Sequence, residues 1–339
     1  MSFFQKPSPY TVSLVVLLPL TLLCLTLLLP SPAYLINPLA TAAGASRCAG
    51  ATVDAGVDRT AAADDGAGAV AGGDHRSRPE FSVLVGVHTT ARKHSRRHLI
   101  RMAYALQQRQ AAPGGAAARV DVRFVLCARP MPPELRAFVA LEARAYGDVL
   151  LLDCAEQPDR GKTYTYFASL PAMLGGGAGA GAGDGGGRPY DYVMKVDDDT
   201  FLRLDALVET LRPAAREDMY CGVGLPFYDR AFPPYMLGMG YLLSWDLVEW
   251  IAGSDMVRKE AIGPEDVTTG NWLNHGNKAK NRVNIIPRMY DYKSAKAEDF
   301  LENTIGVHQL KDDIKWAHTL EHFNLTRLEP STSSMLHNF

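Results

Sequence analysis

The sequence predicts an α/β protein in which a mostly parallel sheet is flanked by helices, preceded by one N-terminal transmembrane helix. From residue 80 onward, short apolar runs alternate with longer segments of helical periodicity. This alternation is typical of a parallel sheet that is covered on both faces. Ahead of it, residues 11–29 form an uncharged, largely apolar run, close to the ~20 residues that a helix needs to cross a bilayer.

We expect the run at 11–29 to remain as a signal-anchor. The alternative is a cleaved signal peptide, whose apolar core usually spans only about 7–15 residues. Lys6 precedes the run without an acidic neighbour, which places residues 1–10 in the cytoplasm and the rest of the chain in the lumen. Residues 30–79 are rich in Ala, Gly, Asp and Pro, so they offer little apolar surface to bury and predict a flexible lumenal stem.

A single folded domain is predicted over residues 80–330, with a C-terminal tail at 331–339. Its first half contains apolar runs that predict strands, and between them lie segments with one apolar helical face. The predicted strands are 81–87, 122–127, 148–154 and 190–196, and the predicted helices are 94–110, 132–146 and 161–174. The Gly/Ala-rich tract at 175–187 interrupts this order and predicts a surface loop.

The second half of the domain has a less regular pattern. A helix is predicted at 205–213 and a strand at 219–225, followed by mixed turn and strand signals at 232–244. Ser244 is a suitable N-cap for a helix at 244–252, and Pro264 is suited to the first turn of another.

Composition excludes some classes of protein. The formal net charge of -2 provides no global field to attract nucleic acid or an anionic membrane surface. The chain has five cysteines with no CxxC or Cys/His cluster, which gives no indication of zinc. Cys127 and Cys154 each end an apolar run; we expect small buried residues there, with a disulfide as the alternative.

Three consecutive acids, Asp197, Asp198 and Asp199, follow the strand at 190–196. Ligands of parallel sheets bind outside the carboxyl ends of the strands. Two carboxylates spaced by one residue can bind Mg²⁺ or Mn²⁺, which leaves coordination positions for water and substrate phosphates. The alternative is a solvated acidic turn with no ligand.

The sequence around the triplet, MKVDDDTFLR, resembles the DxD signature of sugar-nucleotide transferases with the GT-A fold. The blocks RRHLIRMAY, FPPYMLGMGYLLS and GPEDVTTGNWL resemble, in the same order, blocks of the β-1,3-galactosyl- and N-acetylglucosaminyltransferases of glycosyltransferase family 31. The resemblance covers about residues 80 to 310. It implies a GT-A catalytic domain and the type II Golgi membrane layout that residues 1–79 also predict.

The resemblance implies a metal site and a nucleotide site. Asp197 and Asp199 would flank the metal with His308 as third ligand, and Asp198 would lie near the ribose. The expected ion is Mn²⁺, which imidazole suits better than Mg²⁺, and the expected co-substrate is a UDP-sugar. The alternative for His308 is a purely structural histidine at the end of a surface strand.

The resemblance also assigns the acid–base group. Inversion at the anomeric carbon needs a base that takes the proton of the acceptor hydroxyl, and the matching carboxylates are Glu265 and Asp266. We expect Asp266 to be the base and Glu265 to contact the acceptor or orient the base. The alternative is that both are acids favoured by a helix N-terminus.

Several basic residues are candidates for the nucleotide. Arg97 and Arg101 lie four apart on one predicted helix face and match the family's arginine block, and Lys162 matches a Lys-Thr pair of the family. The alternative for the arginines is a solvated basic face. We expect Lys195 to point away from the triplet, with structural pairing and function equally open.

Other residues are secondary candidates. Gly238 and Gly240 would let the backbone approach bound sugar, while Tyr235 and Trp272 would stack on it, although core packing is the favoured interpretation for such aromatics. Asn324 begins an N-glycosylation sequon, which is meaningful only in the lumen.

The sequence therefore predicts an inverting, metal-dependent transferase that moves galactose from UDP-galactose to a glycan or glycoprotein in β-1,3 linkage. UDP-N-acetylglucosamine is the alternative donor. A non-catalytic Golgi protein of the same fold that binds glycans or partners an active transferase is the rival, and a phosphotransferase is a weaker one. We expect a single-pass Golgi membrane protein. The sequence leaves open whether it forms homo- or hetero-oligomers with other Golgi transferases.

Overall fold

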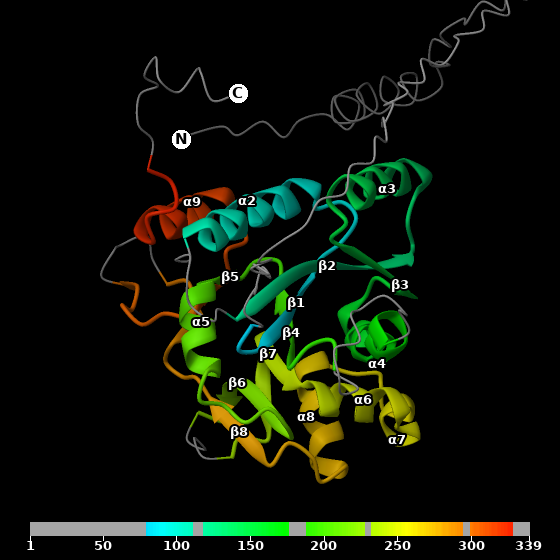
Figure 1. Ribbon diagram of the computed structural model, residues 1–339. Coiled ribbons are helices and arrows are strands. Elements are labelled where there is room, and N and C mark those ends of the chain that lie inside the picture. The colour runs from blue at the N-terminus through cyan, green and yellow to red at the C-terminus, as the bar shows by residue number, and fades with distance from the viewer. Residues whose placement is uncertain (1–78, 111–117, 176–187, 228–231, 294–298, 328–339) are drawn as a thin grey trace, which may run out of the picture. The chain divides into compact units, whose positions relative to one another are not determined.

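The computed structural model describes residues 79–110, 118–175, 188–227, 232–293 and 299–327 (Figure 1). None of the helices in these ranges has both the length and the apolar character that crossing a membrane requires. The predicted cytoplasmic tail, transmembrane segment and C-terminal tail, and nearly all of the predicted stem and Gly/Ala loop, lie outside the described residues. They stay predictions.

A seven-stranded sheet with the order β3-β2-β1-β4-β7-β6-β8 forms the centre of the domain. Six strands run in one direction, and β7 runs antiparallel to both of its neighbours. The predicted mostly parallel sheet is confirmed. The strands are β1 (Ser82–His88), β2 (Arg119–Arg129), β3 (Val149–Ala155), β4 (Tyr192–Asp197), β6 (Met219–Leu225), β7 (Tyr235–Ser244) and β8 (Asn281–Asn284).

Helices cover both faces of this sheet, because successive side chains of each buried strand point to opposite sides. Val83 and Val85 of β1 pack into one apolar cluster, whereas Leu84 packs into the other. The first cluster includes side chains of α2 (His94–Gln110), α3 (Pro133–Tyr146), α5 (Leu204–Leu211) and α9 (Asp313–His322). The second includes side chains of α4 (Lys162–Gly175), α6 (Trp245–Gly253), α7 (Asp255–Lys259) and α8 (Glu265–His275).

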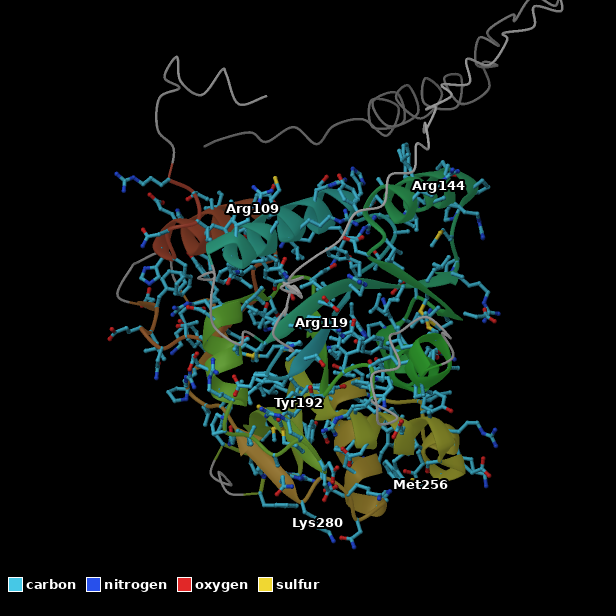
Figure 2. The ribbon with its side chains drawn as sticks, viewed as in Figure 1. Arg109, Arg119, Arg144, Tyr192, Met256 and Lys280 are labelled. Atoms are coloured by element: carbon cyan, nitrogen blue, oxygen red, sulfur yellow. A yellow bond between two sulfur atoms is a disulfide. The ribbon has the colours of Figure 1, made fainter. Side chains whose placement is uncertain are left out.

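Charged side chains surround this core. Figure 2 shows Arg109, Arg144 and Lys280 at the periphery, and all three are exposed. Tyr192, at the start of β4, is fully buried. The distribution is that of an ordinary globular domain.

A second, three-stranded sheet lies after the triplet. Its order is β5 (Phe201–Leu202), β10 (Gly306–His308) and β9 (Met289–Asp291). β10 pairs antiparallel with β5 and parallel with β9. This pairing brings residues from the end of the domain beside the triplet. The sequence pattern does not predict β5, β9 or α9, whereas β10 ends at His308, as the alternative for that histidine supposed.

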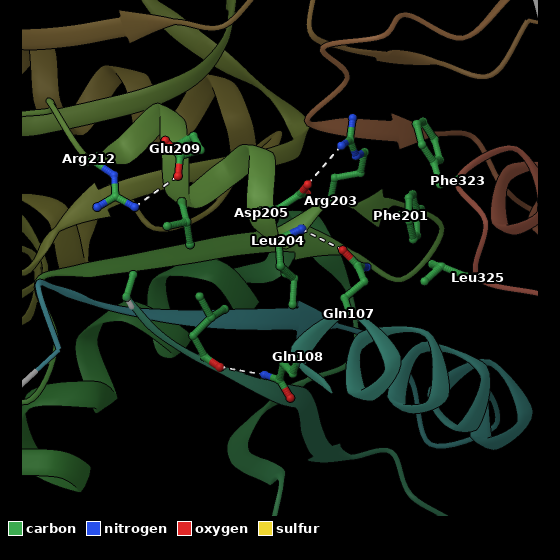
Figure 3. A pocket seen from close by; sticks show the side chains of 13 residues that line it. Gln107, Gln108, Phe201, Arg203, Leu204, Asp205, Glu209, Arg212, Phe323 and Leu325 are labelled. Atoms are coloured by element: carbon green, nitrogen blue, oxygen red, sulfur yellow. Dashed lines mark hydrogen bonds and ion pairs between the residues drawn. The ribbon is translucent and has the colours of Figure 1, made fainter. Parts of the chain in front are cut away.

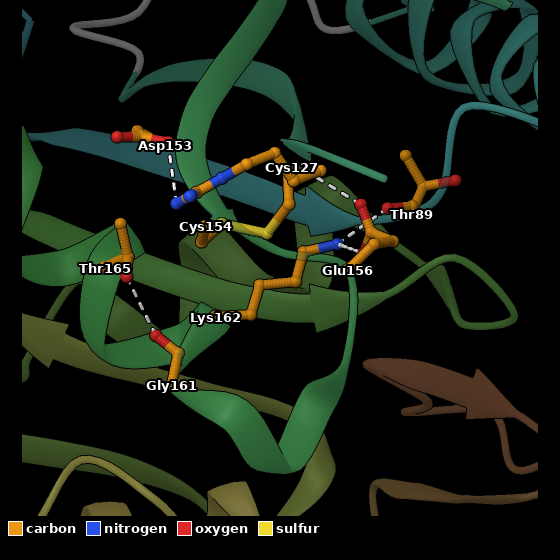
Figure 4. The surroundings of a disulfide bond; sticks show 9 residues. Thr89, Cys127, Asp153, Cys154, Glu156, Gly161, Lys162 and Thr165 are labelled. Atoms are coloured by element: carbon orange, nitrogen blue, oxygen red, sulfur yellow. Dashed lines mark hydrogen bonds and ion pairs between the residues drawn. A yellow bond between two sulfur atoms is a disulfide. The ribbon is translucent and has the colours of Figure 1, made fainter. Parts of the chain in front are cut away.

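Cys127 and Cys154 form a disulfide (Figure 4). The expectation of two small buried thiols was wrong about the bond, although both residues are buried. The parallel pairing of β2 and β3 places their carboxyl ends side by side, which spacing along the chain does not reveal. The backbone N–H of Cys127 also donates to Glu156 Oε2 at 2.8 Å. This hydrogen bond fixes the start of the loop after β3.

A buried ion-pair network joins α2 to α3. Arg97 is 0% exposed, and its guanidinium donates to both oxygens of Glu142 at 2.9 and 2.6 Å. Arg101 pairs with Glu142 and, through two hydrogen bonds, with Asp148. Burial by itself would raise the pKa of Glu142, but the hydrogen bonds and charges of the two arginines outweigh it and lower that pKa.

This network predicts that the free energy of unfolding depends on pH. A carboxyl group with a lowered pKa in the folded state stabilises the fold above its unfolded pKa of about 4.5 and loses that contribution as the pH falls through the folded pKa. Glu142→Gln should lower the unfolding free energy at pH 7 by about 3–5 kcal/mol, because it leaves buried arginine charge uncompensated. Its stability should also fall less steeply below pH 4.5 than that of the wild type.

Denaturant unfolding followed by circular dichroism between pH 3 and 7 measures both effects. Glu134→Gln is the matched control, since Glu134 is an exposed acid in the first turn of the same helix. Equal pH profiles for wild type and Glu142→Gln would contradict the assignment.

Candidate active site

Asp197, Asp199 and His308 converge at the carboxyl end of β4. His308 Nε2 lies 3.3 Å from Asp199 Oδ1 and 4.0 Å from Asp197 Oδ2. One potential ligand atom from each residue falls within 4.8 Å of the others. Two carboxylates and an imidazole are a suitable donor set for a divalent ion of the Mn²⁺ type.

The chain folds this way because the triplet turns immediately after β4. Thr200 N donates to Asp197 O at 3.1 Å, which closes the turn. Leu310 N donates to Asp199 O at 3.0 Å, and Thr200 Oγ1 donates to Met239 O at 2.9 Å. The turn is therefore fixed by the segment after β10 and by β7, far away in sequence.

His308 is oriented by a second carboxylate. Its Nδ1 lies 2.7 Å from Asp291 Oδ1, its partner in the β9–β10 register. This contact leaves Nε2 for the acidic centre, as in the carboxylate–histidine pairs of metal sites. Burial alone would lower the pKa of His308, but its hydrogen bonds to Asp199 and Asp291 outweigh burial and raise it. Sequence analysis missed Asp291, because no motif marks it.

Asp198 faces a different neighbour. Its Oδ1 forms a 2.7 Å ion pair with Lys93 at the start of α2. Its Oδ2 is buried without a hydrogen-bond partner among the described residues, as are Thr89 Oγ1 and His88 Nε2 at the end of β1. Buried polar atoms are rarely left unpaired, so these atoms indicate where a bound ligand would supply hydrogen bonds.

Lys195 connects the triplet to α8. Its buried ammonium lies 2.8 Å from Asp197 Oδ1 and 2.7 Å from Glu265 Oε1, and it donates to Gly238 O. The expectation that Lys195 points away from the triplet was wrong. Strand alternation sends Val196 to the opposite face but places Lys195 and Asp197 on the same one.

Glu265 and Asp266 differ in their surroundings. Both oxygens of Glu265 accept hydrogen bonds from side chains, one from Lys195 and the other from Tyr241 at 2.7 Å. Burial raises the pKa of Glu265, and the charge of Lys195 only partly offsets it. Within the described part of the chain, Asp266 accepts hydrogen bonds from backbone N–H groups alone, those of Gly238 at 3.3 Å and Val267 at 2.8 Å. Asp266 is thus the more available of the two carboxylates.

The structure does not bring Arg97 and Arg101 to this site as open cations. Besides pairing with Glu142, Arg97 donates to the carbonyls of Thr90 and Ala91. These hydrogen bonds fix the backbone of the loop after β1. This corrects the expectation of a direct nucleotide contact. The guanidinium of Arg97 is fully enclosed, and that of Arg101, whose side chain is 12% exposed, is engaged by Glu142 and Asp148.

Lys162 also supports that loop. It is 4% exposed, donates to Thr89 O at 2.7 Å and pairs with Glu156 (Figure 4). Burial lowers the pKa of Lys162. The lysine therefore links the disulfide-bonded ends of β2 and β3 to the end of β1, beside the unpaired Thr89 Oγ1.

Three of the secondary candidates, Gly238, Gly240 and Trp272, serve packing. A Cβ on Gly238 would lie 2.5 Å from Glu265 Oε1, and one on Gly240 would lie 2.7 Å from the Met289 methyl group. These glycines make room for protein side chains, contrary to the expected approach of sugar. Trp272 is 1% exposed and donates to Glu260 O, which confirms the favoured core interpretation.

A separate cavity of about 700 Å³ lies between α2, α5 and the end of the described chain (Figure 3). Its polar groups satisfy one another: Gln107 bonds the backbone of Leu202 and Leu204, and Arg203 pairs with Asp205. None of the converging carboxylates lines it. We therefore place the candidate site at the triplet, where unpaired and charged groups meet.

The chain is similar in sequence to known transferases. No family model matches the chain. A mouse β-1,3-galactosyltransferase is 30% identical over 62% of this chain and 66% of its own length. A β-1,3-galactosyltransferase of Schizosaccharomyces pombe is 28% identical over 70% of this chain and 73% of its own. The chain is therefore similar to β-1,3-galactosyltransferases of two organisms.

A mouse UDP-GlcNAc:βGal β-1,3-N-acetylglucosaminyltransferase is also similar to the chain. It is 29% identical over 41% of this chain and 38% of its own length. The chain thus spans slightly under two thirds of the mouse galactosyltransferase and much less of this relative. Among solved structures, a galactosyltransferase in complex with donor and acceptor sugar analogues has a TM-score of 0.40 at 12% identity, covering 74% of this chain and 98% of its own. Structural similarity at that level adds nothing to the assignment.

Asp291→Ala should weaken Mn²⁺ binding about 10–100-fold, because His308 would lose the partner that orients its imidazole. Calorimetric titration of the purified protein with Mn²⁺ measures the affinity. Asp313→Ala is the control, since Asp313 is 96% exposed and pairs only distantly with Arg96. An unchanged Mn²⁺ affinity in Asp291→Ala would remove Asp291 from the site.

Proposed function

We propose that the chain is an inverting, divalent-metal-dependent transferase of the GT-A type that moves galactose from UDP-galactose to a glycan or glycoprotein acceptor in β-1,3 linkage. The observation that carries this proposal is the convergence of Asp197, Asp199 and His308 at the end of β4, linked through Lys195 to the carboxylates that begin α8. Relatives named as β-1,3-galactosyltransferases support the donor and the linkage.

The donor set fits Mn²⁺, with Mg²⁺ as the alternative, and Asp197 Oδ2, Asp199 Oδ1 and His308 Nε2 would hold the ion. When bound, the ion supplies positive charge to the diphosphate as the sugar–oxygen bond breaks. Lys93, directly before α2, holds Asp198 through Oδ1, so Asp198 Oδ2 can accept a ribose hydroxyl. Thr89 Oγ1 lies on the loop that Arg97 and Lys162 support.

Asp266 is the proposed base. Its carboxylate is stabilised by backbone N–H groups and carries no side-chain cation, so it can take the proton of an acceptor hydroxyl as that oxygen attacks the anomeric carbon. Glu265 is held by Lys195 and Tyr241 and serves to fix the start of α8. This division of roles follows from their different partners.

N-acetylglucosamine is the second candidate for the donor sugar, and the similarity to an N-acetylglucosaminyltransferase supports it. We also propose a single-pass type II protein of the Golgi membrane, on the basis of the apolar run at 11–29 and the stem composition at 30–79. An N-glycan at Asn324 would agree with a lumenal domain, since this residue is exposed after α9.

A panel of UDP-sugars tests the proposed function directly. The purified protein is incubated with each donor, Mn²⁺ and simple galactose- or xylose-terminated acceptors, and UDP release is followed with and without a chelator. We expect UDP-galactose to give chelator-sensitive release and a β-linked product. Release that no donor increases over background, or that persists with chelator, would refute a metal-dependent transferase.

Asp266→Asn should keep affinity for UDP and Mn²⁺ while turnover falls by about 10²–10⁴-fold, the usual contribution of a general base. UDP binding is measured by calorimetry and turnover by UDP release. Glu260→Gln is the control, since Glu260 is a glutamate outside the acidic centre whose carboxylate contacts exposed His275. Loss of UDP binding together with turnover would remove Asp266 from the role of base.

A further inference from the structure

The charges at the end of β4 need compensation from inside the protein. Asp197 and Glu265 come from β4 and α8, yet each places a carboxylate oxygen within 2.8 Å of the same ammonium, that of Lys195. The side chain of Lys195 is 3% exposed. Water therefore screens the Lys195–Glu265 pair little, whereas the Asp197 side chain, which is 36% exposed, is screened more.

All three N–H groups of Lys195 have partners. They are Asp197 Oδ1, Glu265 Oε1 and Gly238 O, so a single cation joins β4, α8 and β7. The missing side chain at Gly238 is part of this arrangement, because a Cβ there would lie 2.5 Å from Glu265 Oε1 and 3.6 Å from Lys195 Nζ. A three-point contact of this kind fixes relative positions as well as charge.

The two carboxylate oxygens of Asp197 have different partners because Lys195 pairs with only one of them. Oδ1 pairs with Lys195, whereas Oδ2 is the atom that lies 4.0 Å from His308 Nε2. The lysine thus leaves one oxygen of Asp197 for the acidic centre. On its other side, Glu265 is the residue directly before Asp266 at the start of α8.

We propose that Lys195 is a positioning residue that sets the acidic centre and the proposed base Asp266 at a fixed separation. The inference rests on the proposed function, in which Asp197 holds the ion and Asp266 takes the acceptor proton. It goes further by assigning the link between these two groups to one buried lysine. Lys195 itself exchanges no proton and makes no bond to substrate.

The kinetic test is Lys195→Met, which keeps the length of the side chain but removes its charge. We expect kcat to fall about 10–100-fold, as when an outer partner of a metal site is lost, with KM for the UDP-sugar changed by less than about threefold. Arg216→Met is the matched control: Arg216 bonds Tyr192 at the opposite end of β4 and the carbonyl of Ala214. It should lower the melting temperature without changing kcat per folded molecule.

A double-mutant cycle on thermal stability tests the link and does not require a measurement of activity. It combines Lys195→Met and Glu265→Gln singly and together, with melting temperature as the readout. Lys195→Met leaves the carboxylates of both Asp197 and Glu265 without their cation, whereas the double variant leaves only that of Asp197, whose side chain is 36% exposed. We therefore expect the double variant to melt higher than Lys195→Met alone, or to fold where that variant does not.

The outcomes separate the two levels of inference. If the wild type transfers no sugar, the proposed function fails, and the stability cycle alone decides whether Lys195 couples the two elements. Additive losses in the cycle, or failure of both the single and the double variant to fold, would overturn the coupling. So would a Lys195→Met enzyme whose kcat per folded molecule equals that of the wild type.

Discussion

The site depends on the concentration of carboxylates at the end of β4 and on the separate partner that holds each of them. Asp197 has Lys195, Asp198 has Lys93, and Asp199 has His308. Adjacent like charges would otherwise repel one another. Because each partner comes from a different element, the acidic turn can persist only when the sheet, α2 and β10 are all in place.

The same principle organises the loop after β1. Arg97 and Lys162, expected as ligand-binding cations, instead hold the carbonyls of residues 89–91 from behind. Their charges are neutralised by Glu142 and Glu156, and the disulfide at Cys127 and Cys154 anchors the latter. Thr89 Oγ1, on this loop, is buried without a hydrogen-bond partner among the described residues.

Sequence reasoning anticipated most of the regular structure. The strands at 82–88 and 192–197 and the helix at 94–110 lie within two residues of their predicted bounds, because their apolar runs and periodicity are local signals. It missed β5 and β9, and it anticipated β10 only as the surface strand that His308 would close; these short strands exist through pairing with distant segments. It also failed for Asp291, whose role depends entirely on that pairing.

The sequence by itself determined most strands of the main sheet, though not β8, as well as the acidic triplet at the end of one of them and the order of blocks that carries the family resemblance. These are properties of consecutive residues. Only the tertiary structure decided which groups meet: that Cys127 bonds Cys154, that Lys195 faces the triplet, and that the arginines turn inward. The physical reason is that burial and ion pairing depend on distances between segments far apart in the chain, and residue types alone do not specify those distances.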